Sequence, residues 1–262
     1  MQKLSSARFT RPKHVDIELV AVAYRNRKFP VHVHEQYVIG AIETGAEILR
    51  LEGKQHVVGE GHLITLNPGQ AHSNCSIGDE MLEYRVFYTP SELVEAYTGR
   101  PDLCFMTPSR RDLSASQRLL SLHRWFEQDI GDRLEQESAT AEIIEIAFED
   151  AGRSNGHVQP PQNVGKAKCY IDRHYRESFG LDAVAEVAGV TKSHLVRRFK
   201  NAYGLSPFAY RTQRRIHEAK RLVLEGTPLA EIAAELGFSD QSHLTRQFQS
   251  TVGISPARYR EQ

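Results

Sequence analysis

Two groups of residues in this sequence have types and spacings that are typical of binding sites. The first is a set of histidines, in which His32 and His34 lie two residues apart and His72 follows Gly61 through the run HLITLNPGQA. Residues two apart on a β-strand project to the same face, so imidazoles at this spacing can share one ligand. Three histidines with a carboxylate would supply the ligands of a non-haem iron or zinc site.

The second group is a pattern that occurs twice near the end of the chain, in residues 181–211 and 229–260. Each copy has an alanine-rich apolar run, a glycine, an apolar residue, two or three polar residues and then S-H-L-x-R-x-F. Each copy closes with glycine, Leu or Ile, Ser-Pro and Tyr-Arg. One helix-turn-helix pattern is a weak signal, because helix pairs rich in alanine are common cores, but two copies in the same order indicate DNA reading.

Each copy predicts two helices that are joined by a tight turn. Gly189 and Gly237 end the first helix, because glycine accepts the left-handed backbone of such a turn. Thr191 and Ser239 are of the residue types that cap the start of a helix, and they are predicted to open the second one.

Apolar residues four apart predict the buried face of each second helix, with Leu195 and Phe199 in one copy and Leu244 and Phe248 in the other. The opposite face is then available to the major groove, where arginine pairs with guanine, glutamine with adenine, and valine with the thymine methyl. The predicted DNA-binding residues are Ser193, Val196, Arg197 and Lys200 in the first copy and Gln241, Ser242, Thr245 and Arg246 in the second.

A helix over residues 207–224 is predicted to join the two copies, with an apolar stripe on one side. Its other side is basic and is predicted to face solvent or phosphate. The residues of this basic side are Arg214, Arg215, Lys220 and Arg221.

Charge and composition indicate that these two groups belong to separate domains. The 262 residues suffice for about two domains. Residues 1–162 hold 17 Lys and Arg against 23 Asp and Glu, whereas residues 163–262 hold 16 against 10, so the basic half is the one expected to face phosphate. The predicted division is a sensing and candidate dimerisation domain (1–152), a polar linker that contains two prolines (153–165), and a DNA-binding domain (166–262).

The first domain has two predicted parts, one made of strands and one made of helices. Residues 15–90 contain short β-rich runs with closely spaced glycine turns, which favour a sandwich or small barrel. Residues 114–151 have apolar positions at helical spacing and predict an antiparallel helix pair. The apolar stripes of this pair fit either core packing against the strands or a dimer seam, and the sequence leaves both open.

Several classes of protein are disfavoured. The cysteines Cys75, Cys104 and Cys169 lie far apart, which argues against a disulfide framework or a cysteine-based zinc site and suits a reducing cytoplasm. The first residues are polar, so no signal peptide is expected, and no apolar run approaches the ~20 residues of a membrane span. We therefore expect a cytoplasmic protein that does not associate with membranes.

At its repeated motifs the chain resembles the AraC family of bacterial transcription regulators. The resemblance covers residues 163–262, and G-I-S-P-x-x-Y-R at 253–260 is among the family's most specific stretches. It implies a module of seven helices whose two recognition helices enter successive major grooves, about one helical turn or ~34 Å apart. Ser193 is small where some members carry a bulky residue, so their base preference does not transfer.

Residues 20–90 are similar to the cupin-like sensor domain of the same family. Asn67 stands where the second cupin motif usually has proline. The glutamate that follows the paired histidines in metal-binding cupins is missing, since Val38 and Ile39 occupy its place. These departures favour a small-molecule effector over a catalytic metal.

The resulting prediction is an α+β protein with two domains, an N-terminal cupin-like β-barrel with a helical hairpin and a C-terminal all-α module with two helix-turn-helix units. Its predicted function is sequence-specific transcription regulation, modulated by an effector that binds in the barrel. The predicted effector-binding residues are His32, His34, Tyr37, His72 and Tyr84.

No enzyme activity, catalytic residue, cofactor or metal is predicted. His32, His34 and His72 form the alternative metal set, and an iron-dependent cupin enzyme is the alternative function for this half. A constitutive DNA-binding protein with an empty barrel is a second alternative. The predicted partners are double-stranded DNA, a small-molecule effector and a second copy of the chain, with RNA polymerase as a further candidate.

Overall fold

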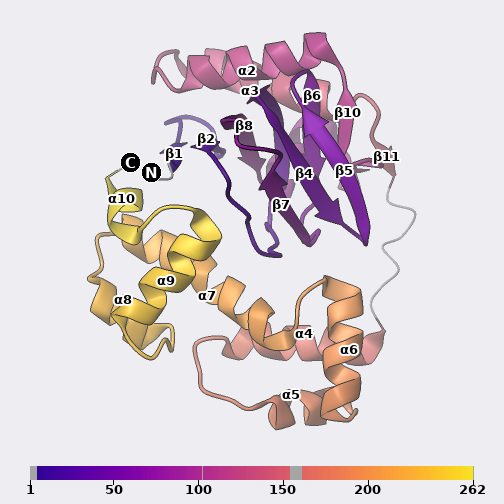
Figure 1. Ribbon diagram of the computed structural model, residues 1–262, viewed down its shortest axis with the longest axis vertical. Coiled ribbons are helices and arrows are strands. Elements are labelled where there is room, and N and C mark those ends of the chain that lie inside the picture. The colour runs from indigo at the N-terminus through magenta and orange to yellow at the C-terminus, as the bar shows by residue number, and fades with distance from the viewer. Residues whose placement is uncertain (1–4, 102, 154–160, 262) are drawn as a thin grey trace. The chain divides into compact units, whose positions relative to one another are not determined.

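The computed structural model describes residues 5–101, 103–153 and 161–261. The chain divides into two compact units, one made mostly of residues up to 155 and the other mostly of residues from 156 onward. The first unit is β-rich and the second is helical (Figure 1). The predicted α+β fold with two domains is therefore confirmed.

The first unit contains antiparallel sheets that pair segments far apart in sequence. A six-stranded sheet has the order β1 (Ser5–Thr10), β2 (Glu18–Tyr24), β8 (Leu82–Thr89), β3 (Tyr37–Thr44), β6 (His62–Leu66) and β10 (Ser109–Arg111). A three-stranded sheet has the order β5 (Lys54–Gly59), β4 (Ala46–Leu51) and β7 (His72–Ser76), and a short pair joins β9 (Leu103–Cys104) to β11 (Gly152–Arg153). Across the described residues these sheets are not hydrogen-bonded to one another as a closed barrel.

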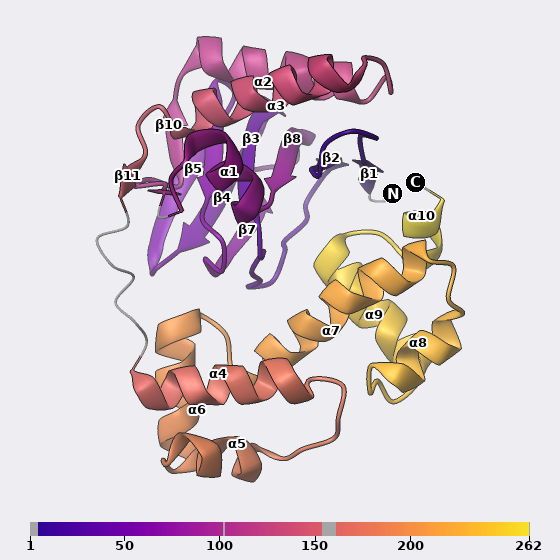
Figure 2. The ribbon, with the colours of Figure 1, turned by 180° about the vertical axis from the view of Figure 1, so that it is seen from behind.

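Alternation along the strands gives the six-stranded sheet two different faces. One face packs its apolar side chains against the helices α2 (Leu113–Phe126) and α3 (Arg133–Phe148) (Figure 2). Ile39, Leu63 and Phe87 lie on this face, in one cluster with Leu119 and Ile143. The predicted helix pair thus exists, and these apolar side chains form core with the strands.

The described strands and helices include several that the sequence analysis did not predict. They include β1, β7, β10 and the helix α1 (Ser91–Thr98). The sequence of β7, HSNCS, is polar and lacks the apolar alternation that marks a half-buried strand. The strands form because neighbouring strands pair with them, as Leu49 pairs with Asn74.

The second unit consists of helices of 5 to 18 residues. They are α4 (Gln162–His174), α5 (Leu181–Ala188), α6 (Lys192–Tyr203), α7 (Pro207–Leu224), α8 (Leu229–Glu235), α9 (Gln241–Val252) and α10 (Pro256–Arg260). The helix α4 begins inside the segment that was predicted as a linker, residues 153–165, and 154–160 of that segment lie outside the described residues.

Candidate functional site

The first helix-turn-helix is α5 followed by α6. Gly189 ends α5 in the left-handed conformation, with φ 64° and ψ 37°, as the sequence predicts. Thr191 caps α6, and its hydroxyl accepts a hydrogen bond from the backbone N–H of His194 at 3.4 Å. The tight turn therefore sets the direction of α6 through residues that adjoin it.

The second helix-turn-helix is α8 followed by α9, and its cap differs from the prediction. Asp240, not Ser239, caps α9 and accepts from the backbone N–H of His243 at 2.7 Å. The hydroxyl of Ser239 instead donates to the Asp240 carboxylate at 3.0 Å. Asp240 lies three residues before His243, as Thr191 lies three residues before His194, so Asp240 and not Ser239 occupies the capping position.

The two second helices bury the predicted faces. Leu195 and Phe199 of α6 are buried, as are Leu244 and Phe248 of α9. All the predicted DNA-binding side chains are accessible. Exposed residues are Ser193, Arg197, Lys200, Gln241, Ser242 and Arg246, while Val196 and Thr245 are half-buried.

A Tyr-Arg pair at the end of each copy binds to the segment just before the first helix of the same copy. Tyr210 and Tyr259 are buried, and the arginine that follows each tyrosine donates to backbone carbonyls. Arg211 reaches the carbonyl of Phe179 at 3.3 Å, and Arg260 reaches those of Val223 and Thr227. Phe179 and Thr227 each lie two residues before the first helix of their copy, so the repeat extends from sequence to tertiary contacts.

Arg215 of α7 is buried, which corrects its predicted place on the solvated side of the joining helix. Its side chain donates to the carbonyls of Tyr175 at 2.6 Å and Glu177 at 3.0 Å, and to the carbonyl of Gly237. Burial lowers the pKa of its guanidinium to about 10, so the group stays charged at neutral pH. Arg215 therefore ties the segment before α5 to the turn between α8 and α9.

Glycine is required at position 237, where Arg215 contacts the turn, for two reasons. Its φ of 71° lies in the left-handed region, and a Cβ there would lie 2.6 Å from Nη2 of Arg215 and 2.7 Å from the carbonyl oxygen of Arg176. The close approach of the turn between α8 and α9 to Arg215 and to the segment before α5 thus depends on a residue without a side chain.

The rest of the basic side of α7 is also engaged within the protein. Arg221 pairs with Glu218 at 2.7 Å and with Glu225. Arg214 pairs with Asp172 at 3.3 Å, and the Lys220 ammonium lies 5.5 Å from the centre of the Tyr259 ring. These contacts stabilise the joining helix.

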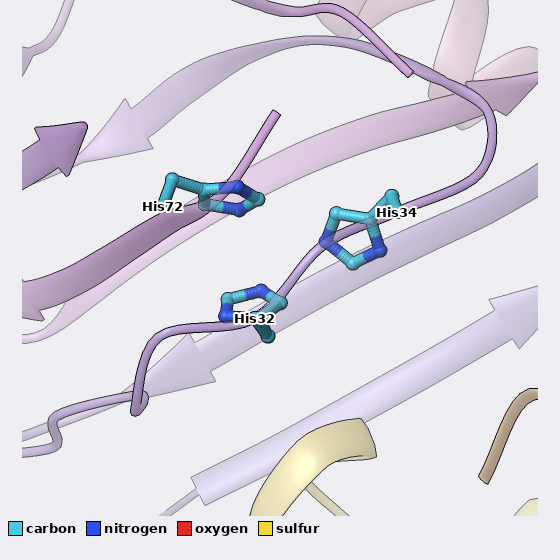
Figure 3. A group of neighbouring side chains, drawn as sticks. All are labelled: His32, His34 and His72. Atoms are coloured by element: carbon cyan, nitrogen blue, oxygen red, sulfur yellow. The ribbon is translucent and has the colours of Figure 1, made fainter. Parts of the chain in front are cut away.

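Beside the strands of the first unit, the predicted histidines come together. His32 and His34 lie on the segment that leads into β3, and His72 is the first residue of β7 (Figure 3). One ring nitrogen of each histidine lies within 4.8 Å of the others. The ring of His34 also packs on Tyr88, with centroids 4.8 Å apart.

Tyr84 belongs to a buried polar network. The sequence analysis named Tyr84 but none of the other residues of this network. The ring of Tyr84 meets that of Tyr24 edge-on, with centroids 6.2 Å apart. The amide of Asn74 donates to the carboxylate of Glu47 at 2.7 Å and to the hydroxyl of Tyr24 at 3.3 Å. Burial raises the pKa of Glu47 to about 7, although hydrogen bonds from Asn74 and Tyr24 oppose the shift.

Alternation could have revealed part of this network. Glu47 has the same parity in β4 as Leu49 and Leu51, and all three are buried. Asn74 has the same parity in β7 as His72. The sequence analysis therefore missed one signal, a carboxylate at a strand position whose alternate neighbours are apolar and buried.

Tyr37 does not join the histidines. Its ring packs on Phe105 and Phe148, and its hydroxyl donates to the carbonyl of Leu103 at 2.6 Å. It belongs to the core beneath α2 and α3. The structure therefore gathers His32, His34 and His72 in one place, sets Tyr84 in the network of Glu47, and leaves Tyr37 apart.

Within the described residues, no helix is long and apolar enough to cross a membrane. Two family models match the chain. Residues 14–144 match the AraC-like ligand binding domain, and residues 184–262 match a helix-turn-helix domain. These matches cover the two regions that hold the histidines and the repeated motif.

Several curated relatives and solved structures are similar over most of the chain. The uncharacterized HTH-type transcriptional regulator YbfI of Bacillus subtilis is 31% identical over 245 residues, which is 88% of each protein. The arabinose operon regulatory protein of Salmonella typhimurium is 26% identical over 78% of this chain and 76% of its own length. An apo crystal structure of a ToxT variant from Vibrio cholerae has a similar fold, with a TM-score of 0.60 at 15% identity over 96% of this chain and 99% of ToxT.

Proposed function

This chain belongs to the AraC family of transcription regulators, and from that premise we propose that α6 and α9 read two adjacent major grooves while the first unit binds a polar effector. The protein is a DNA-binding regulator with an AraC-like ligand-binding domain. The observation that carries the proposed reading mode is the matched geometry of the two helices. Each buries Leu and Phe at the same positions and exposes an arginine two residues after the leucine.

The chemistry of the two exposed faces supports sequence-specific contacts. Arg197 and Arg246 can pair with guanine, Gln241 can pair with adenine, and the Val196 side chain can contact a thymine methyl. Lys200 supplies a positive charge for phosphate. Because the two faces differ in sequence, we propose that the site they read is asymmetric.

The buried network supports a polar effector for the first unit. Glu47, Asn74, Tyr24 and Tyr84 offer a carboxylate, an amide and two hydroxyls, which can exchange their mutual hydrogen bonds for bonds to a polar ligand. A ToxT structure of similar fold holds an unsaturated fatty acid. We propose the histidine cluster and this network as the two polar parts of the effector-binding region.

Effector binding can regulate transcription only if it favours one arrangement of the protein over another. The effector must bind the DNA-competent arrangement more tightly than the other, and by linkage DNA then tightens effector binding equally. We propose that the linker transmits this preference. The proposed division remains 1–152, 153–165 and 166–262.

The outer surface of the helix pair supports dimerisation. A groove of about 590 Å³ lies between α2 and α3, and its lining combines apolar with polar side chains: Leu122, Trp125, Leu134 and Ala139 with Arg118, Ser121, Glu135, Ser138 and Glu142. The side chain of Leu134 is exposed, at 71%. Exposed apolar side chains on a helix pair suit a second copy of the same pair, so we propose a homodimer.

We further propose that the protein acts in the cytoplasm, contacts RNA polymerase when bound beside a promoter, and has no enzyme activity of its own. Its relatives are transcription regulators, which supports this assignment. The alternative of an iron-dependent enzyme predicts oxygen uptake with a substrate by the iron-loaded protein. Absence of uptake together with specific DNA retention distinguishes the two functions.

Selection of bound DNA tests the proposed reading mode. The full chain is incubated with sheared genomic DNA at near-physiological salt, because phosphate binding at low salt hides specificity. The expected result is a shared motif with two short boxes about one helical turn apart. Retention without any shared motif, in the presence and absence of cell metabolites, would contradict the proposal.

A further inference from the structure

The three histidines form a compact cluster of nitrogen donors. Their ring nitrogens lie within 4.8 Å of one another, and Figure 3 shows the three rings grouped around a common space. Two nitrogens that bind one ion at about 2.1 Å lie at most about 4.2 Å apart. Small rotations of the rings therefore suffice to bring all three nitrogens onto one ion.

Hydrogen bonds to the backbone determine which nitrogen of two histidines can bind. Nδ1 of His32 lies 2.9 Å from the carbonyl oxygen of Pro30, and Nδ1 of His72 lies 3.0 Å from that of Gln70. A carbonyl oxygen only accepts, so Nδ1 must carry the proton and the lone pair must be on Nε2. Metal-binding histidines in proteins are held by such outer hydrogen bonds.

The backbone around the cluster is also held in place. The N–H of Gly69 donates to the carbonyl of His34 at 2.7 Å, which ties the loop before His72 to the segment that carries the other two histidines. Asn67 then joins this loop to Phe105 through two hydrogen bonds. The side-chain amide N–H of Asn67 donates to the carbonyl of Phe105 at 3.0 Å, and the backbone N–H of Phe105 donates to Oδ1 of Asn67 at 2.8 Å. These hydrogen bonds hold the two segments that carry the three histidines in fixed positions, which favours a common ligand.

Two of the three histidines are buried. The exposed fraction is 7% for His32 and 5% for His72. Such burial keeps bulk water away from the ring nitrogens that would bind the ion.

We propose that His32, His34 and His72 bind one divalent transition-metal ion through one ring nitrogen each. Three neutral imidazoles suit Zn²⁺, Co²⁺ or Ni²⁺, whereas Mg²⁺ and Ca²⁺ require oxygen ligands. Three protein ligands leave a coordination position open, which water or an oxygen atom of an effector can occupy. The metal site is independent of DNA reading by α6 and α9, so either proposal can fail without the other.

Cobalt provides a direct test. The full chain is treated with a chelator, dialysed and titrated with Co²⁺, whose visible absorption reports inner-sphere nitrogen ligands, and Zn²⁺ is then added to displace it. One equivalent of Co²⁺ per chain, displaced by Zn²⁺ and not by Mg²⁺, is the expected result. Absence of a saturable one-to-one signal with Co²⁺ and with Zn²⁺ overturns the proposal.

Variants assign the ion to these residues. His34→Ala and His72→Ala should each weaken Zn²⁺ binding by more than the roughly 10–100-fold that loss of an outer hydrogen bond typically costs. His62→Ala is the matched control, because Nδ1 of His62 also lies near a backbone carbonyl, that of Gly59 at 3.1 Å, and His62 lies outside the cluster. Equal Zn²⁺ affinity in His72→Ala and His62→Ala contradicts the assignment.

A second measurement guards against misfolded variants. The metal-free and Zn²⁺-loaded wild-type proteins are compared by thermal unfolding, and the ion should raise the midpoint in proportion to its saturation. A variant that lacks the wild-type circular dichroism spectrum is replaced by His72→Gln, which keeps a polar side chain of similar size. Wild-type protein whose midpoint does not respond to saturating Zn²⁺ or Co²⁺ also counts against the site.

Discussion

The two units place their polar chemistry in opposite environments. The DNA-reading helices carry arginine, glutamine and lysine on exposed faces, while the first unit buries Glu47 and Asn74 between strands. An exposed side chain can change without affecting the fold, whereas a buried one is held by partners that it also stabilises. Substitutions in the reader should therefore alter DNA affinity, and substitutions in the sensor should alter stability first.

Arg215 is an exception to this contrast, because it is a buried charge in the DNA-reading unit. Its substitution is expected to have the largest effect on stability. Arg215→Ala removes hydrogen bonds to three carbonyls and should lower the free energy of unfolding by about 3–5 kcal/mol. Urea unfolding measures this loss. Arg221→Ala, at an exposed ion-paired arginine of the same helix, should cost much less, because solvent screens exposed ion pairs. Equal losses in the two variants would show that Arg215 does not join the two copies.

The pH dependence of stability tests the buried side of the comparison. Burial raises the pKa of Glu47 from 4.5 to about 7, so its contribution to stability is fully present below pH 4.5 and is lost as the pH rises through 7. The loss is about 3 kcal/mol in total. Glu47→Gln resembles the protonated acid and should remove this part of the pH dependence. Parallel stability curves for both proteins between pH 5 and pH 8 would contradict the shift.

The exposed side of the comparison predicts effects on DNA alone. Arg197→Ala and Arg246→Ala should each weaken binding at the preferred site by ~1–3 kcal/mol and relax base preference at one position. Stability should change by less than about 0.5 kcal/mol. Affinity for variant sites, measured at fixed salt, checks both claims. Unchanged affinity at the preferred site would rule out the groove assignment for that helix.

The smallest effect separates the two candidate caps of α9, Asp240 and Ser239. Asp240→Ala should lower the thermal unfolding midpoint, because the carboxylate accepts from the N–H of His243. Ser239→Ala should lower it less, since the hydroxyl of Ser239 contacts two side chains, the Asp240 carboxylate and the His243 ring. Thermal unfolding of the two variants ranks them, and the reverse order would restore Ser239 as the cap.

The same contrast explains what the sequence could predict. The reader was predictable because its signals are local, as Gly189 lies next to the turn it makes and Leu195 and Phe199 lie four apart. The burial of Arg215 was not predictable, because two of its partners, Tyr175 and Gly237, lie 40 and 22 residues away. Nothing in the periodicity of α7 indicates where those carbonyls will be.

The sensor was harder to predict because its polar residues come from separate strands. Tyr37 follows His34 by an odd number of residues, and in a continuous strand that parity places the two on opposite faces. The histidines, however, precede β3, so parity alone could not determine where they point. Glu47 and Asn74 meet only because β4 pairs with β7.

The central claim is that α6 and α9 read one face of the same DNA, and changing the spacing of their boxes tests it most directly. With the selected operator in hand, about half a helical turn, roughly 5 base pairs, is inserted between the two boxes, and the affinity of the full chain is measured at fixed salt. Two rigidly joined recognition helices predict that the insertion reduces affinity nearly to that for non-specific DNA. Affinity that is unchanged by the insertion would contradict the claim that the two helices bind as one unit.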